Sequence, residues 1–157
     1  MAGNAQREGL PARSRESEVF VLLLRAADAL LREAEVLLKR SDLSQTQYNV
    51  LRILRGAGPG GLPCREIGRR MITRDPDITR LLDRLEARGL VTRGRERHDR
   101  RVVTSRITAQ GLKVLKQLDA PINQLHRRQF ERLSARKLGL LMRLLEGARE
   151  REGTAPD

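Results

Sequence analysis

Residues 74–90 have the sequence RDPDITRLLDRLEARGL, which specifies a helix with one apolar and one polar side. Asp75 is a good N-cap, Pro76 suits the first helical position, and Asp77 favours the positive end of a helix. Gly89 is a typical residue just past a helix C-terminus. The apolar side is formed by Ile78, Leu81, Leu82 and Leu85. We therefore predict an amphipathic helix that starts at Pro76 and ends before Gly89.

Two short segments after this helix are typical of β-strands, namely residues 91–96 and 102–107. Both contain β-branched residues, and a polar segment joins them. That segment, RERHDRR at residues 95–101, places five cationic residues around Glu96 and Asp99. We expect a β-hairpin with this basic stretch at its turn.

Two shorter helices are predicted upstream. Ser44 begins an S-x-x-Q capping box. The helix after it has an apolar face made of Val50, Leu51 and Leu54. The glycine-rich residues 56–61 end that helix, and Pro63 opens another at residues 64–71. Followed by the amphipathic helix that starts at Pro76 and by the hairpin, these elements predict a winged helix–turn–helix.

Longer helices flank this module. Residues 17–40 repeat apolar residues at three- and four-residue steps, in a stripe so broad that it needs cover on more than one side. A second subunit can provide that cover. Residues 109–130, with an expected kink at Pro121, and residues 135–148 form the last two helices. In the last helix we expect four leucines to point inward: Leu138, Leu141, Leu144 and Leu145. The predicted fold class is mainly α with a small β-hairpin wing.

The chain of 157 residues fits one compact domain or subunit, with a formal net charge of +12. Such an excess indicates a polyanionic partner, either nucleic acid or an anionic membrane surface, although many soluble proteins are also basic. Residues 65–106 hold 13 basic and 7 acidic residues, which is half of the net excess. Because that segment contains most of the predicted winged helix–turn–helix, nucleic acid is the favoured partner.

The sequence offers little for other classes of function. Cys64 is the only cysteine, so no internal disulfide can form and a reducing compartment fits. The apolar run at residues 19–24 is too short to span a membrane, and no signal peptide is recognisable. Residues 56–61 lack a phosphate-loop lysine, and two histidines with one cysteine form no metal-ligand pattern. We predict a cytoplasmic, nucleoid-associated protein with no membrane partner, no metal, no cofactor and no enzymatic activity.

The helix that starts at Pro76 is assigned the reading role, since the N-terminal part of a recognition helix meets base edges in the major groove. Thr79 and Arg80 are the expected reading positions. Arg74 and Arg84 are expected to touch phosphates, although any single arginine can instead be a solvated surface residue. Asp77 can accept a hydrogen bond from cytosine N4, or it can simply stabilise the start of the helix.

Four segments together resemble the MarR family of bacterial transcriptional regulators. They are LSQTQYNVLRIL, CREIGRRM, DPDITRLLDRLEARGLVTR, and DRR followed by RITAQG. The resemblance covers about residues 17–150. It is most specific in TRLLDRLEARGLV and in the triplet at residues 99–101, which is followed by a helix that opens Thr-x-x-Gly at residues 108–111.

The resemblance implies a homodimer that binds a near-palindromic operator in double-stranded DNA. Residues 17–40 and 108–150 would be dimerisation helices, residues 41–107 the DNA-binding lobe, and residues 1–16 and 151–157 flexible tails. Each recognition helix would enter a major groove while each wing flanks it in the minor groove. Family members are mostly repressors, and many are released by small-molecule effectors. The sequence leaves the effector of this chain unknown.

The resemblance also gives the wing residues separate roles. Asp99 is expected to orient Arg101, which probes the minor groove. A narrow minor groove attracts arginine. An arginine held by a carboxylate loses less freedom on binding than an unrestrained one. Arg97 and Arg100 would contact phosphates.

Other interpretations remain open at this point. The chain can be an architectural or weakly specific DNA-binding protein that uses the same charge. It can also be a cysteine-based redox-responsive regulator, because Cys64 lies near a predicted helix N-terminus, where thiols tend to be more reactive. A winged helix that serves only protein contacts would carry mostly acidic residues on its recognition face, and this chain does not.

Overall fold

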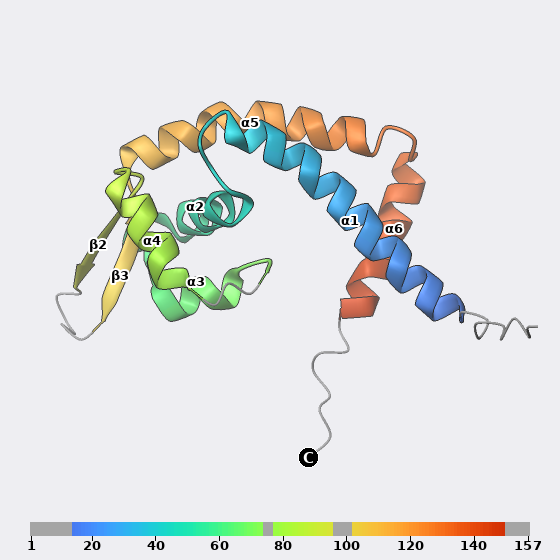
Figure 1. Ribbon diagram of the computed structural model, residues 1–157, viewed down its shortest axis with the longest axis horizontal. Helices are drawn as coiled ribbons and strands as arrows, with labels where there is room; N and C mark the ends of the chain where they lie inside the picture. Colours follow the sequence, from blue (N-terminus) through green and yellow to red (C-terminus); the bar gives the residue numbers. More distant parts are fainter. Residues whose placement is uncertain (1–13, 74–76, 96–101, 150–157) are drawn as a thin grey trace, which may run out of the picture.

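In a computed structural model, the described residues are 14–73, 77–95 and 102–149. They form six α-helices, one 3-10 helix and three short strands (Figure 1). In chain order these are α1 (Arg15–Lys39), α2 (Gln45–Ala57), η1 (Gly58–Gly60), β1 (Leu62–Pro63), α3 (Cys64–Arg70), α4 (Ile78–Ala87), β2 (Val91–Arg95), β3 (Val103–Ile107), α5 (Ala109–Gln129) and α6 (Ala135–Arg149). The predicted order and fold class are confirmed, and α5 continues through Pro121.

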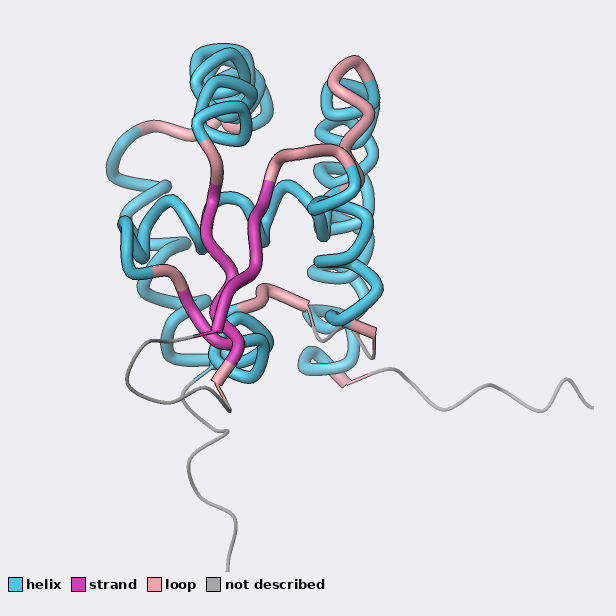
Figure 2. The backbone as a smooth tube through the Cα atoms, turned by 90° about the vertical axis from the view of Figure 1, so that its left-hand side faces the viewer, coloured by secondary structure: helices cyan, strands magenta, loops and turns pink. Residues whose placement is uncertain are grey.

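The sheet is antiparallel with the strand order β1-β3-β2, and Figure 2 shows its strands running between helices on either side. β2 and β3 form the predicted hairpin, with Val91 opposite Ile107 and Arg95 opposite Val103. A third strand was not predicted from the sequence: Leu62 and Pro63 pair with β3. A strand of two residues is too short to carry any alternation of apolar and polar residues, so the sequence did not reveal it.

One aliphatic core holds α2, α3, α4 and the first residues of β2 together. Its fully or almost fully buried members include Leu51, Leu54, Ile67, Leu82, Leu85 and Val91. The predicted capping box at the start of α2 is present: Ser44 Oγ accepts the backbone N–H of Gln47, and Gln47 Oε1 accepts the backbone N–H of Ser44. These two bonds satisfy backbone donors that a helix start otherwise leaves without partners.

Long-range polar contacts attach α2 to α5 and the end of α4 to the turn between α1 and α2. The guanidinium of Arg55 on α2 makes two hydrogen bonds to the carboxylate of Asp119 on α5, at 2.8 and 3.0 Å. Arg88, just after α4, donates to the backbone carbonyls of Ser41 and Asp42 in the turn between α1 and α2. The orientation of α4 is therefore fixed by both its buried face and its C-terminal end.

The start of α4 differs from the prediction. The helix begins at Ile78 rather than Pro76, and its N-cap is Asp77 rather than Asp75. The reason is that Asp77 Oδ1 itself accepts the backbone N–H of Arg80, which defines the cap position. Asp75 and Pro76 lie outside the described residues. The C-terminal end agrees with the prediction, because the helix stops before Gly89, whose φ is 68°.

The outer helices leave large apolar surfaces uncovered within one chain. In α1 only Ala34 and Leu38 are buried, while Phe20 and Leu22 are 61% and 63% exposed. The prediction that four leucines of the last helix point inward is wrong for the single chain, since α6 has no buried residue. Leu144 is 62% exposed because the helix packs against no core of its own chain. No helix among the described residues has the length and apolar character needed to cross a membrane.

Candidate nucleic-acid interface

The exposed side of α4 is polar and carries the residues expected to read DNA. Thr79, Arg80 and Arg84 are exposed, whereas Leu81, Leu82 and Leu85 on the opposite side are buried in the core. This arrangement follows from helical geometry, because residues three and four positions apart lie on one face. The amphipathic character predicted from the sequence is therefore present, and α4 presents its polar side to solvent.

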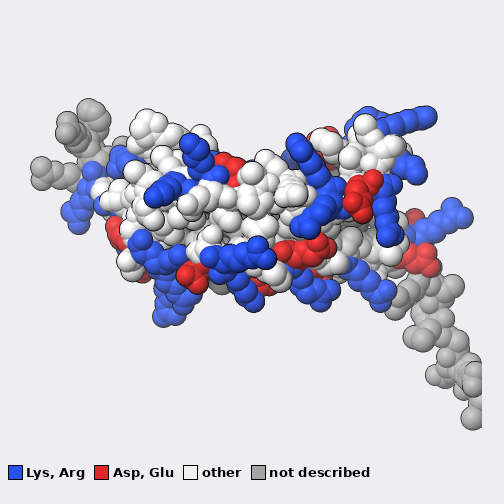
Figure 3. Space-filling view, turned by 90° about the horizontal axis from the view of Figure 1, so that it is seen from above, with Lys and Arg blue, Asp and Glu red and all other residues white. Residues whose placement is uncertain are grey.

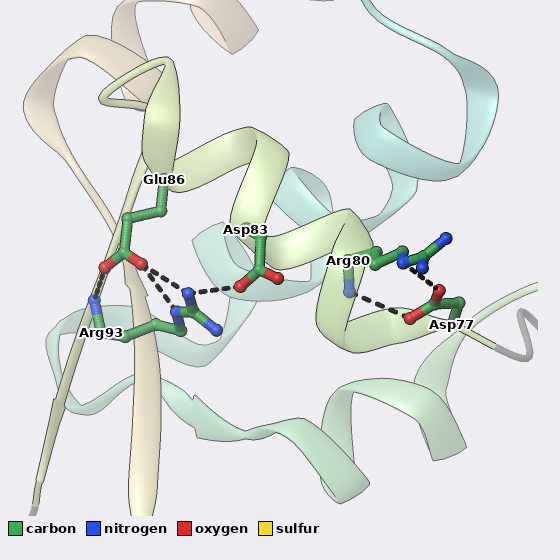
Figure 4. Close-up of polar contacts among 5 residues, drawn as sticks. All are labelled: Asp77, Arg80, Asp83, Glu86 and Arg93. Carbon is green, nitrogen blue, oxygen red and sulfur yellow. Dashed lines mark hydrogen bonds and ion pairs between the residues drawn. The ribbon is translucent and has the colours of Figure 1, made fainter.

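Asp77 and Arg80 form a local pair at the start of α4 (Figure 4). One carboxylate oxygen of Asp77 accepts the backbone N–H of Arg80, and the other lies 3.1 Å from Arg80 Nε. This capping bond explains why an acid suits position 77, in line with the expectation that Asp77 stabilises the start of the helix. The suggested hydrogen bond from cytosine stays a prediction. The Arg80 side chain is 76% exposed, so its outer nitrogens can reach a partner in solution.

A shallow groove of about 390 Å³ runs between the start of α2 and the start of α4. It is lined by Ser44, Thr46 and Gln47 from α2 and its cap, and by Asp77, Arg80, Leu81 and Arg84 from α4 and its cap. The positive end of the α2 dipole therefore faces the two arginines across the groove. Both features favour an anion, which suits the phosphate backbone that flanks a major groove.

A second cluster of charges joins α4 to the wing. Arg93 on β2 points at α4, where its guanidinium lies between the carboxylates of Asp83 and Glu86 (Figure 4). Arg93 Nε donates to Glu86 Oε2 at 2.8 Å, and the backbone N–H of Arg93 donates to Glu86 Oε1 at 3.0 Å. The hydrogen bond to Glu86 raises the pKa of Arg93, and the one to Asp83 adds to it, while partial burial acts the other way. Arg93 is therefore a fixed cation.

This cluster was missed at the level of sequence. The signal was present, because two acids one helical turn apart on this helix are followed within ten residues by arginines on a strand. Arg93 and Arg95 lie two positions apart and therefore on the same side of the strand, so the choice between them depends on which one lies level with the two acids of α4. Only the packing of the hairpin decides that question: the Arg95 side chain is exposed, whereas that of Arg93 is 27% exposed.

Positive charge is not confined to the recognition helix. Figure 3 looks down on the face that includes α5, and Lys and Arg side chains there outnumber Asp and Glu. Arg and Lys residues on α5 and α6 account for part of this excess. Net charge alone therefore does not locate the interface, and the argument depends on the geometry of α4 and the wing.

The remaining predicted contact residues cannot be placed. Arg74 before α4, and Arg97, Asp99, Arg100 and Arg101 at the tip of the hairpin, lie outside the described residues. The structure does place the ends of the strands that carry the tip, with Arg95 paired to Val103. The expected roles of these five residues, including the orientation of Arg101 by Asp99, stay predictions.

Two other residues singled out from the sequence have ordinary environments. Cys64 is the first residue of α3 and is partly buried against the core. His126 on α5 is exposed and shares a hydrogen bond of 3.0 Å with Gln129, whose side-chain amide donates to the backbone carbonyl of Leu30 on α1. Neither environment points to a catalytic role.

A helix with an exposed polar side on a helix–turn–helix scaffold, flanked by a three-stranded wing, defines a winged-helix DNA-binding protein. Residues 41–102 match the model of the MarR family. A MarR transcription factor from Planctomyces limnophilus has a crystal structure that is 42% identical, covers 85% of this chain and 97% of its own, and superposes with a TM-score of 0.67. The chain belongs to the MarR family and is a DNA-binding transcriptional regulator.

Two further relatives show what members of this family do. The HTH-type transcriptional repressor IacR of Pseudomonas putida is 30% identical over 84% of this chain and 78% of its own length. The PcaV transcriptional regulator of Streptomyces coelicolor, crystallised in complex with its natural ligand, is 25% identical with a TM-score of 0.73. That alignment covers 90% of this chain and 98% of PcaV.

Proposed function

We propose that this chain is a homodimeric repressor that binds a near-palindromic operator and is released by a small-molecule effector. The observation that carries the proposal is the exposed side of α4, which presents Thr79, Arg80 and Arg84 to solvent, with Arg80 and Arg84 lining the groove at the start of α2. Thr79 and Arg80 meet base edges, since they are in the first turn of the helix. Arg84, together with Arg74 before the helix, contacts phosphates.

The wing adds contacts on either side of the major groove. Arg101 enters the minor groove, Asp99 holds it in position, and Arg97 and Arg100 contact phosphates. Support comes from the placement of β2 and β3, which extend beside α4 and carry this tip. Residues 41–107 are thus the DNA-binding lobe.

Dimerisation follows from the apolar surface of the outer helices. Residues 17–40 and 108–150 form the dimer platform, with α1 and α6 contributing most of the apolar side chains. Exposed apolar surface of this extent is unusual for a soluble monomer and is typical of an interface. Two copies related by a two-fold axis place two α4 helices about one turn of DNA apart, roughly 34 Å, which suits a near-palindrome.

An effector that is small, apolar and anionic fits the surfaces available for release. A groove of about 260 Å³ between α1 and α5 is lined by Glu33, Val36, Leu37, Arg40, Leu125 and Arg128. Its leucines favour an apolar ring, and its two arginines favour a carboxylate. PcaV, which has been crystallised with its natural ligand, supports ligand control in a relative. Benzoate added to the protein–operator complex is a first probe of this site.

Two competing functions are less well supported by the described residues. An architectural DNA-binding protein would use the same charge, but the reading side of α4 also carries Thr79 and the acids Asp77 and Asp83, which bulk attraction to phosphate does not require. An enzyme would need a nucleophile with its base, or a phosphate loop, and no such arrangement occurs among the described residues. The repressor acts in the cytoplasm, where its DNA is.

Selection of binding sites from random duplex DNA, followed by footprinting, tests the proposal. A protected near-palindrome is expected, with specific binding at least about 10³-fold tighter than binding to unselected DNA. Enrichment of no sequence would contradict a specific regulator and would favour the architectural alternative.

A further inference from the structure

The connection between the recognition helix and the wing is short. α4 ends at Ala87 and β2 begins at Val91, so Arg88, Gly89 and Leu90 form the whole turn. Gly89 has a φ of 68°, a conformation that suits glycine, and the backbone N–H groups of Gly89 and Leu90 donate to the carbonyls of Glu86 and Leu85. Thr108 also donates to the carbonyls of Gly89 and Leu90. These bonds fix the end of α4, and the position of the rest of β2 against α4 depends on contacts made across the turn.

Buried residues supply only the first of these contacts. Leu90 and Val91 are 3% and 2% exposed and anchor the beginning of β2 in the core. Further along the strand, Thr92 and Arg95 are exposed to solvent. The side chain that ties the middle of β2 to α4 is Arg93, with contacts that cross the turn.

These contacts are directional. Glu86 is held by both of its oxygens, one bonded to the backbone N–H of Arg93 and the other to Arg93 Nε. Arg93 Nη2 lies 2.5 Å from Asp83 Oδ1 and 2.7 Å from Glu86 Oε2, so one guanidinium spans a full turn of α4. A planar guanidinium with fixed donor directions restricts rotation as well as distance.

We propose that Arg93 is a positioning residue, which holds the wing at a fixed angle to the recognition helix through Asp83 and Glu86. The major-groove and minor-groove contacts of one subunit then bind as a single rigid unit, which lowers the cost of ordering the wing on DNA. This inference rests on the proposed operator binding. It assigns a function to two acids on the recognition helix of a strongly basic protein.

A simple charge argument makes the opposite prediction. Asp83 and Glu86 are 50% and 37% exposed, so on electrostatic grounds alone their removal should strengthen binding to any DNA. If they position the wing, their removal should weaken binding to the operator even though net charge rises. The sign of the effect therefore separates the two explanations.

The test compares the wild-type dimer with a variant that carries Asp83→Ala and Glu86→Ala. For each protein, the dissociation constant is measured with the duplex selected from random DNA and with a mixed-sequence duplex of equal length. The specificity ratio is the dissociation constant for mixed sequence divided by that for the selected duplex. We expect this ratio to fall about tenfold, the size typical of coupling between groups in contact, with unchanged or tighter binding to mixed sequence. This ratio does not depend on the fraction of correctly folded protein, so a purely structural role for the acids would leave it unchanged.

A matched control raises net charge by the same amount elsewhere. Asp28→Ala with Glu35→Ala removes two acids of α1 that form exposed pairs with Arg32 and Lys39. This variant should keep the specificity ratio. Hydroxyl-radical footprints add a second readout, since the Asp83 and Glu86 variant should lose protection at the outer minor grooves before it loses protection at the major grooves.

A single substitution covers the case in which the double variant does not fold. Arg93→Lys keeps the positive charge but cannot bridge both carboxylates, and it should lower the specificity ratio in the same way. An unchanged ratio in either variant would overturn the positioning role while leaving the proposed function intact. If the wild-type protein selects no sequence at all, the proposed function fails, and the positioning role fails with it.

Discussion

Gly111 lies in the first turn of α5, close to backbone atoms of the turn that follows α4. A Cβ at this position would overlap the carbonyl oxygen of Leu90 and the side chain of Ile107. The backbone N–H of Gly111 also donates the capping hydrogen bond to Thr108 Oγ1 at 3.0 Å. The residue is therefore glycine because the start of α5 must pack tightly on the recognition helix and the wing.

Gly111→Ala should destabilise the protein although alanine favours helices. We expect a loss of about 1–3 kcal/mol in the free energy of unfolding, as found for overpacked cores. Urea unfolding at matched protein concentration measures it. Gly147→Ala is the control, because a Cβ there meets nothing within 4 Å. That substitution should be neutral or should stabilise α6 by up to about 1 kcal/mol, and equal effects at the two sites would contradict the packing argument.

The acid in the wing tip gives a second prediction at this scale. Asp99→Ala should weaken operator binding although it makes the chain more basic, because Arg101 then loses its orienting partner. Arg101→Ala should weaken binding by roughly 1–3 kcal/mol if its contact resembles a good base contact. A gel-shift titration of both variants measures these losses. Tighter operator binding by Asp99→Ala would rule out the orienting role.

At the scale of single elements, the start of α2 is set by its capping box. Ser44→Ala removes the acceptor for the backbone N–H of Gln47, and we expect a loss of about 1 kcal/mol of stability. Thermal unfolding monitored by circular dichroism measures the change. Ser44→Asp keeps a capping acceptor and should retain most of the stability. An equal loss in both variants would mean that the hydroxyl acts in some other way.

How well each element was predicted depends on where its information lies. α2 was predicted together with its cap, because the capping residues and the apolar spacing are all local in sequence. α4 was predicted with two candidate acids at its start, and the wrong one, Asp75, was assigned as the cap. Local preference does not distinguish Asp75 from Asp77, since both suit a helix start. The position is decided by how the buried face of α4 docks on the core.

At the scale of the whole molecule, the exposed apolar helices predict a dimer that specific substitutions can break. Leu23→Glu on α1 or Leu144→Glu on α6 places a charge in the proposed interface, where the side chains are 39% and 62% exposed in one chain. We expect the mass measured by light scattering to fall to that of one chain, together with operator affinity. A buried charge without a partner costs several kcal/mol, enough to dissociate the subunits.

Ile72→Glu is the matched control for this prediction. Ile72 is an exposed apolar residue, at 75%, but it lies between α3 and α4, outside the proposed dimer platform. This variant should remain dimeric. A dimer that survives both Leu23→Glu and Leu144→Glu would place the interface elsewhere.

The sequence by itself determined the order of the helices, the hairpin and the fold class, because periodicity, caps and glycine positions act over a few neighbouring residues, and its motifs resemble those of the MarR family. It also identified α4 as the helix that presents Arg80 and Arg84 to solvent. Only the tertiary structure decided that Leu62 and Pro63 join the sheet, that α6 has no core within its own chain, and that Arg93 binds Asp83 and Glu86. Each of these depends on which faces of separate elements meet, and that is settled when the core packs as a whole.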